Sequence, residues 1–111
     1  MSVGDPPPGP PDPVQALLGL DRVVHEPVRL ALLSLLAGAQ EAEFKFLESA
    51  LGLSKGNLSS HAARLEDAGY IEVRKTFRRK LPVTSYRITD AGRAALGGYW
   101  AALREAAPGG S

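Results

Sequence analysis

The clearest pattern of apolar positions in the first half of the chain is helical. Val28, Leu32 and Leu36 recur at intervals of four residues, which places them on one face of a helix. Pro27 suits the first turn of that helix, and Gly38 suits its end. The pattern predicts a helix that starts at residue 27 and stops at the glycine.

The next two apolar segments predict a pair of helices with a very short connection. The first is expected over residues 45–51, where Gly52 ends it. The second is expected over residues 54–68, because Ser54 is a natural N-cap and Gly69 can adopt the left-handed conformation after the end. Its apolar face consists of Leu58, Ala62 and Leu65. Only three residues join the two helices, which is the tight turn of a helix-turn-helix.

The period of the pattern then changes to that of a strand. Residues 70–77 alternate between apolar and polar side chains, and residues 83–88 alternate again. One face of the first run carries Ile71, Val73 and Phe77, and one face of the second carries Thr84, Tyr86 and Ile88. The two runs predict a β-hairpin with the basic segment 78–82 at its tip. Glu43 and Phe44 are expected to add a very short strand.

The two ends of the chain complete the predicted fold. A short helix is expected over residues 13–20, and Thr89 is expected to cap a final helix with an apolar stripe. That stripe consists of Leu96, Tyr99, Trp100 and Leu103. The order of elements predicts a mainly α winged helix-turn-helix: a three-helix core, a β-hairpin wing and a C-terminal helix. We expect one domain over 14–107, a disordered proline-rich arm over 1–13 and a disordered tail over 108–111.

The net charge of +1 conceals an uneven distribution along the chain. Residues 1–53 carry three basic and seven acidic side chains, a balance of −4. Residues 54–93 carry nine basic and four acidic side chains, a balance of +5. The segment that holds the second helix of the pair and the hairpin is therefore suited to bind a polyanion.

The outer face of helix 54–68 is unlike an ordinary solvated face, which is usually rich in Glu–Lys pairs. Its residues are small or form hydrogen bonds, so the helix backbone can approach base edges closely. Asn57 can pair with adenine and Arg64 with guanine in the major groove. Lys55 and the N-terminal amides of the helix suit a phosphate oxygen. The residues predicted to bind DNA here are Ser54, Lys55, Gly56, Asn57, Ser59, Ser60 and Arg64.

The hairpin supplies a second basic element, with five cations in seven residues. Such a cluster repels itself unless something neutralises it. Next to a helix that reads the major groove, it is expected to contact phosphates or to enter the minor groove. The wing residues predicted to bind DNA are Arg74, Lys75, Arg78, Arg79 and Lys80.

Three stretches of the chain carry a family resemblance. They are HEPVRLALLSLL in the first long helix, LGLSKGNLSSHAARLEDAGYIEV from the turn to the first wing strand, and LPVTSYRITDAGRAAL before the last helix. With them, residues 20–103 resemble winged-helix regulators of the MarR and ArsR type, especially the short stand-alone family related to them. The resemblance implies a homodimer that binds a roughly palindromic DNA operator and represses or activates nearby genes.

The same resemblance assigns roles to residues of this chain. It implies major-groove positions for Lys55, Asn57, Ser59, Ser60 and Arg64, and wing positions for Arg78, Arg79 and Lys80. The chain departs from the family in having no glycine at the wing tip. It also lacks the cysteines that ArsR-type metal sensors often use.

The apolar stripe of the last helix exceeds what three short helices and a hairpin need as cover. We predict that it forms the seam of a homodimer, together with the segment 14–23. The predicted interface residues are Leu17, Leu20, Leu96, Tyr99, Trp100 and Leu103. A two-fold dimer would set its two recognition helices about one DNA turn, or about 34 Å, apart.

Other functional classes find less support in the sequence. There is no cysteine, and neither His25 nor His61 has a second ligand at helical spacing, so we predict no metal site and no cofactor. No nucleophile motif or phosphate-binding loop indicates an enzyme. The longest apolar run, residues 30–37, is too short to span a bilayer. We expect a cytoplasmic protein that is associated with the nucleoid when it binds DNA.

Two alternatives to sequence-specific DNA binding follow from the same fold. A winged helix can serve as a protein-interaction module, and a dimer can act as a switch for an unknown small-molecule effector bound between its helices. The basic wing and the small-residue helix face favour DNA over protein docking. No buried polar cluster in the sequence identifies an effector.

Overall fold

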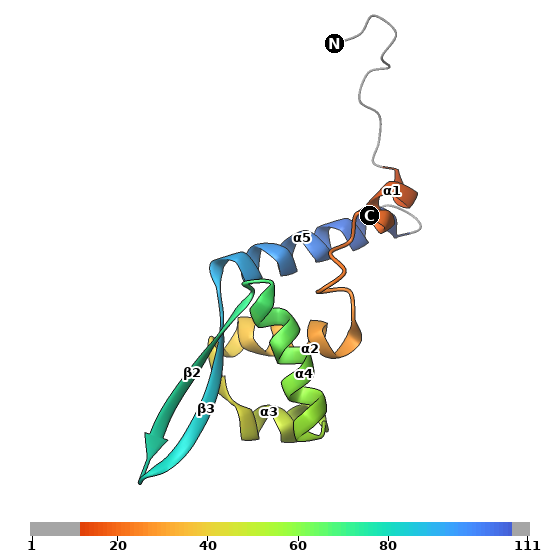
Figure 1. Cartoon of the computed structure of the whole chain (residues 1–111). Helices are drawn as coiled ribbons and strands as arrows, with labels where there is room; N and C mark the ends of the chain where they lie inside the picture. Colours follow the sequence, from red (N-terminus) through yellow and green to blue (C-terminus); the bar gives the residue numbers. More distant parts are fainter. Residues whose placement is uncertain (1–11, 108–111) are drawn as a thin grey trace, which may run out of the picture.

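The computed structural model describes residues 12–107. Of the predicted arm over 1–13, only Asp12 and Pro13 lie inside this range, and the predicted tail over 108–111 lies outside it. The described chain forms five helices and three strands (Figure 1). In chain order they are α1 Pro13–Leu18, α2 Pro27–Ala39, β1 Glu41–Glu43, α3 Phe44–Leu51, α4 Lys55–Asp67, β2 Ile71–Arg78, β3 Leu81–Ile88 and α5 Asp90–Ala106.

The core lies among α2, α3 and α4 and is closed by the sheet and by α5. The side chains with no exposed surface are Val24, from the loop before α2, and six leucines of the three helices, Leu32, Leu33, Leu36, Leu47, Leu58 and Leu65. Ile71 and Tyr86 add the inner face of the sheet, and Leu96 adds α5. Among the helices of residues 12–107, none combines the length and the apolar character needed to cross a membrane.

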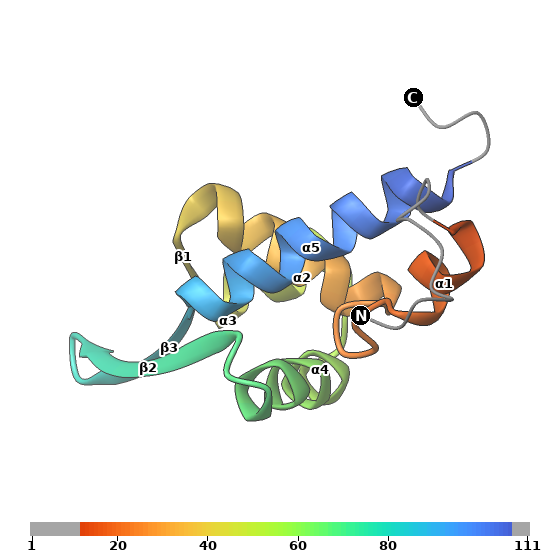
Figure 2. The same cartoon turned by 90° about the horizontal axis from the view of Figure 1, so that it is seen from above.

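The sheet is antiparallel with the strand order β1-β3-β2. Strand β1 pairs only with residues 85–87 of β3, whereas β2 and β3 pair along their whole length to Arg78 and Leu81. The outer half of the hairpin therefore has no third strand and projects as a wing. The wing lies at one end of the molecule, and α1 with the last turns of α5 lies at the other (Figure 1, Figure 2).

The wing turns without a glycine. Arg79 and Lys80 form its two-residue tip with φ angles of 53° and 66°, so both lie in the left-handed region. Two-residue hairpin turns need positive φ at both positions and usually hold Asn-Gly or Gly-Gly. Pro82 sits inside β3 rather than beside it. Arg78 and Leu81 form the hydrogen-bonded pair that closes the hairpin, so the next pair, Phe77 and Pro82, is a non-hydrogen-bonded one. The nitrogen of Pro82 therefore points away from β2, and the ladder between β2 and β3 loses no hydrogen bond.

A tight joint fixes α5 against the turn that follows α4. The hydroxyl of Thr89 donates to the carbonyl of Gly69 (2.6 Å) and accepts from the amide of Gly92 (3.0 Å). A β-carbon at position 92 would lie 2.2 Å from the carbonyl oxygen of Tyr70. Glycine is therefore required where the first turn of α5 meets this carbonyl.

Besides the start of β3, which is at Leu81 and not at residue 83, three predicted boundaries were wrong by one or two residues. Helix α2 continues through Gly38 and ends at Ala39, with Gln40 taking the positive φ of 70° at its C-cap. Phe44 begins α3 and is not part of the short strand, because β1 ends at the last residue that pairs with β3. Helix α1 ends at Leu18, where the amide of Gly19 closes the last turn.

Candidate nucleic-acid interface

Helix α4 is positioned by its first residues and by its apolar face. Gly52 ends α3 in the left-handed conformation, with φ 64° and ψ 38°. Two residues later, the hydroxyl of Ser54 accepts a hydrogen bond from the amide of Asn57 (3.2 Å), which is the N-cap that the sequence predicts. The predicted apolar face is confirmed, since Leu58, Ala62 and Leu65 are buried. The opposite face must therefore point outward.

That opposite face is exposed along its whole length. The exposed residues are Ser54, Lys55, Gly56, Asn57, Ser59, Ser60, Ala63 and Arg64. Its acidic side chains, Glu66 and Asp67, come only in the last turn. The N-terminal three turns therefore present hydroxyls, an amide and two cations on a backbone with little side-chain bulk. Such a surface can enter a DNA groove without placing a carboxylate near a phosphate.

A polar contact on the flank of α4 was not predicted from the sequence. Arg29 Nη1 of α2 donates to Nδ1 of His61 on α4 (3.2 Å), and Oε2 of Glu26 lies 3.4 Å from the same nitrogen. Arg29 Nε also donates to the carbonyl of Val23 (2.6 Å). The contact ties α4 to the start of α2.

Glu26 has two tasks in this contact. It caps α2 by accepting from the amide of Arg29 (2.8 Å), and it faces His61. Burial alone would raise the pKa of Glu26, but hydrogen bonds from the backbone amides of Arg29 and Val28 and the charge of Arg29 hold it below its ordinary value. The carboxylate therefore stays ionised and fixes the start of α2 against α4.

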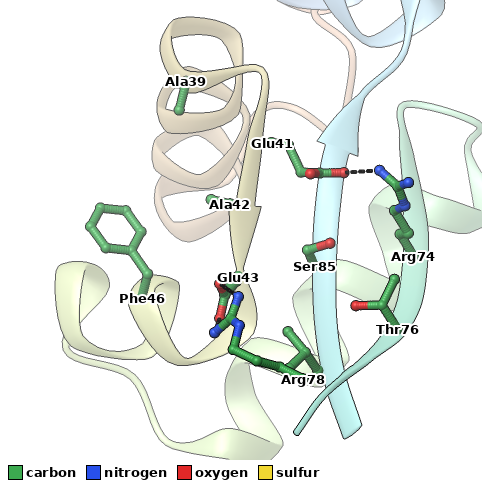
Figure 3. A pocket seen from close by; sticks show the side chains of 10 residues that line it. Ala39, Glu41, Ala42, Glu43, Phe46, Arg74, Thr76, Arg78 and Ser85 are labelled. Carbon is green, nitrogen blue, oxygen red and sulfur yellow. Dashed lines mark hydrogen bonds and ion pairs between the residues drawn. The ribbon is translucent and has the colours of Figure 1, made fainter.

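The wing has two chemically different faces. On one face, Arg74 of β2 reaches across β3 to Glu41 of β1 (3.5 Å), and Arg78 reaches Glu43 (2.7 Å) (Figure 3). Ser85 of β3 lies beneath these side chains and is only 7% exposed. The hydrogen bond and charge of Arg78 lower the pKa of Glu43. Both pairs are exposed, so they contribute little to stability, but they orient the two arginines toward β1.

The remaining wing cations are not engaged in this way. Within residues 12–107, neither Lys75 nor Arg79 nor Lys80 forms an ion pair. Lys75 lies on the face of β2 toward α4, where it lines a hollow with Ser59 and Thr84. The five predicted wing residues thus separate into two that brace the sheet and three whose charge is free for an anion.

The braced face of the wing borders a groove of about 610 Å³ between the sheet and the end of α2 and start of α3. Its lining residues are Ala39, Glu41, Ala42, Glu43, Phe46, Arg74, Thr76, Arg78, Val83 and Ser85 (Figure 3). The four charged residues neutralise one another in pairs. No group of three potential metal ligands occurs within residues 12–107.

The predicted dimer residues divide by burial. Leu20, Leu96 and Tyr99 are at most 9% exposed and belong to the core of the single chain. The hydroxyl of Tyr99 is also in contact with Nδ1 of His25 (2.9 Å). These three side chains have almost no surface left for a partner. Leu17 and Trp100 are 50% and 41% exposed and remain available, and Leu103 is half-buried.

Comparisons with known proteins agree with this geometry. The family described as "Winged helix DNA-binding domain" matches residues 28–107. An uncharacterized protein of Methanocaldococcus jannaschii is 35% identical over 78 residues, which are 70% of this chain and 85% of that protein.

Two solved structures extend the likeness to the whole fold. A transcriptional regulator homologue from Pyrococcus horikoshii superposes with a TM-score of 0.75 at 27% identity, over 83% of this chain and 90% of that one. A protein from Halomicrobium mukohataei with a GntR superfamily winged-helix-turn-helix domain superposes with a TM-score of 0.58 at 26% identity, over 95% of this chain and 78% of that one. The predicted winged-helix fold is confirmed.

Proposed function

Because the chain belongs to the family of winged helix DNA-binding domains, we propose that it is a transcriptional regulator that binds double-stranded DNA sequence-specifically as a homodimer. Helix α4 lies in the major groove and the tip of the wing lies on the backbone or in the minor groove of the same site. The similar protein of Pyrococcus horikoshii is described as a transcriptional regulator homologue, which supports a regulatory role. Such a protein works at the chromosome, in the cytoplasm.

The outer face of α4 carries this proposal. Asn57 and Arg64 are both exposed and lie on the side opposite the buried Leu58 and Leu65. An Asn amide can form two hydrogen bonds with adenine, and an Arg guanidinium two with guanine. Gly56 leaves the space in front of the helix open, since no atom lies within 4 Å of a β-carbon there. Base edges can therefore approach the helix backbone.

The free wing cations supply the sequence-independent part of binding. Lys75, Arg79 and Lys80 bring three unpaired positive charges to the side of the hairpin and its tip, and Lys55 adds one at the start of α4. Each phosphate that they neutralise releases counterions, so binding weakens as salt rises. Arg74 and Arg78 are assigned to bracing the wing.

A homodimer is supported by the end of the molecule far from the wing. There α1 lies beside the last turns of α5 (Figure 2), and Val14, Leu17, Leu18 and Trp100 all leave 41% or more of their surface exposed. Exposed apolar side chains on two neighbouring helices favour a protein partner. A second copy of the chain, related by two-fold symmetry, covers the patch with the same patch.

The alternatives have weaker support. A protein-docking winged helix would be expected to present large apolar or acidic residues on α4, and its outer face has neither in the first three turns. The family and the structural relatives are DNA-binding regulators rather than enzymes. A small-molecule effector stays a prediction that no residue identifies.

Selection of bound sequences from random duplex DNA at a low and a higher salt concentration tests the proposal. We expect enrichment of an inverted repeat with half-sites about one helical turn apart, and the same repeat at both salt concentrations. Enrichment of a single half-site would support sequence-specific DNA binding but would contradict the proposed homodimer. Retention of DNA without any enriched sequence would overturn sequence specificity.

A further inference from the structure

The wing carries an aromatic side chain that the fold leaves uncovered. Phe77 is 76% exposed, the highest value among the large apolar side chains of residues 12–107. It lies one residue before the pair of Arg78 and Leu81 that closes the hairpin, and its partner across the ladder is Pro82. Strand β1 ends its pairing at Ser85. Phe77 and Pro82 therefore form an apolar pair near the tip of the hairpin, where β1 no longer pairs with β3.

The ring lies on the face of the wing that turns toward α4. Side chains alternate along a strand, so Phe77 shares its face with Val73 and Lys75. Those two residues line a surface hollow together with Ser59 of α4. The other face is the one where the arginines are held by β1. Phe77 is thus on the same side as the helix that we propose reads DNA.

The surroundings of the ring are cationic. Lys75 precedes it on the same face, and Arg79 and Lys80 follow it at the tip, with no ion pair to any residue in 12–107. An apolar protein surface would have to desolvate these charges, so it is a poor partner for the ring. A DNA base step offers a flat apolar surface and negative phosphates on either side of it. The charge of the tip therefore selects DNA as the occupant.

From this geometry we propose that Phe77 is a wedge, which inserts between two base pairs in the minor groove beside the half-site and kinks the duplex. Pro82 supports the ring from the neighbouring strand, and the flanking cations hold the phosphates of the opened step. Apolar side chains that enter the minor groove act in this way in architectural DNA-binding proteins. Pyrimidine–purine steps such as TpA are the easiest to unstack. The inference rests on the proposed function and adds DNA bending to it.

The test uses duplexes built on the selected repeat with a TpA step beside each half-site. If selection enriches no repeat, a mixed-sequence duplex rich in TpA steps replaces it. One duplex carries donor and acceptor dyes at its ends, and another carries 2-aminopurine at the TpA step. Saturating wild-type protein should raise both the energy transfer and the 2-aminopurine fluorescence. Phe77→Ala should lose both increases while it still saturates the duplex.

Leu81→Ala is the matched control, because Leu81 is 68% exposed at the same tip but on the opposite face of the hairpin. It should keep both increases, and both variants should unfold at the temperature of the wild-type protein, since the side chains are exposed. Bending by Phe77→Ala equal to that of the wild type would overturn the proposal. The proposal would also be overturned if duplex saturated with wild-type protein showed the same energy transfer and 2-aminopurine fluorescence as free duplex.

Two further outcomes have other meanings: one shows that the protein does not bind DNA, and the other shows that Phe77 contacts lipid instead of DNA. If neither wild type nor variant saturates any duplex, it is the proposed function that fails. If vesicles containing an anionic lipid retain the wild type but not Phe77→Ala, while DNA bending does not depend on Phe77, the ring contacts a lipid surface and the wedge is refuted.

Discussion

Gly92 begins α5 against the turn that follows α4, and its missing side chain lets the two approach. A β-carbon there would lie 2.2 Å from the carbonyl oxygen of Tyr70, whereas at Gly97 of the same helix nothing lies within 4 Å. We expect Gly92→Ala to lower the free energy of unfolding by about 1–3 kcal/mol or more, because the backbone must move. Gly97→Ala should raise it by up to about 1 kcal/mol through helix propensity. Urea denaturation of both variants measures the contrast, and equal effects would refute the close approach.

The contact between Tyr70 and Asp21 joins the loop before α2 to the start of β2. The hydroxyl of Tyr70 donates to the carboxylate of Asp21. Burial alone would raise the pKa of Asp21, but this bond and the amides of Val23 and Val24 lower it. The hydrogen bond to Asp21 also raises the pKa of Tyr70 to about 12, so the hydroxyl remains a donor at neutral pH.

This contact predicts a pH-dependent loss of stability. A carboxylate whose pKa is lower in the folded state stabilises the fold above its unfolded pKa, and this contribution is lost as pH falls through the folded value. Tyr70→Phe should therefore cost about 1–2 kcal/mol at neutral pH and progressively less toward about pH 3. Urea denaturation at both pH values measures this. If the loss of unfolding free energy in Tyr70→Phe stays constant over this pH range, the pKa of Asp21 does not depend on Tyr70.

At the scale of the elements, the wing is a ribbon with one braced and one free face. Replacing Lys75, Arg79 and Lys80 with Ala should weaken binding to all duplexes and reduce the slope of log affinity against log salt by up to about three units. Replacing Arg74 and Arg78 with Ala should reduce the slope less per charge removed, because these arginines already have carboxylate partners. Binding titrations at several salt concentrations give both slopes. An equal change per charge would mean that DNA displaces Glu41 and Glu43.

The sequence predicted the elements that depend on local signals. The N-cap Ser54, the inward Leu58 and Leu65 and the hairpin alternation all act within a few residues, so the order of elements and the exposed face of α4 could be read directly. The bracing of the wing could not. It requires β1 to pair with β3, which brings Glu41 to Arg74 from a distance of 33 residues along the chain.

Two other features depended on how far the core extends. The alternation of β2 places Phe77 on the same face as Ile71 and Val73. The strand extends beyond the core before it reaches Phe77, however, and a periodic pattern does not show at which residue the core stops burying that face. The same holds for the predicted dimer stripe. Its period correctly placed Leu96 and Tyr99 on one face, but that face packs on the chain's own helices, and only Trp100 lies at its exposed border.

At the scale of the whole molecule, the DNA-reading surface and the apolar patch lie at opposite ends. We expect Trp100→Ala to shift the protein from dimer to monomer, because aromatic side chains contribute strongly to interfaces. Phe46→Ala is the control, since Phe46 is 56% exposed on α3, away from the patch. Sedimentation equilibrium measures the mass of each. A dimer that survives Trp100→Ala would move the interface away from α5.

Protection of guanine N7 from methylation by dimethyl sulfate tests most directly whether α4 reads the major groove. On the selected duplex, saturating wild-type protein should protect guanines in two clusters about one helical turn apart. Arg64→Ala should bind with the guanine of each half-site unprotected and with about 1–3 kcal/mol less discrimination against other sequences. Complete binding by the wild type with every guanine N7 still reactive would contradict the account, because the recognition helix would then lie outside the groove.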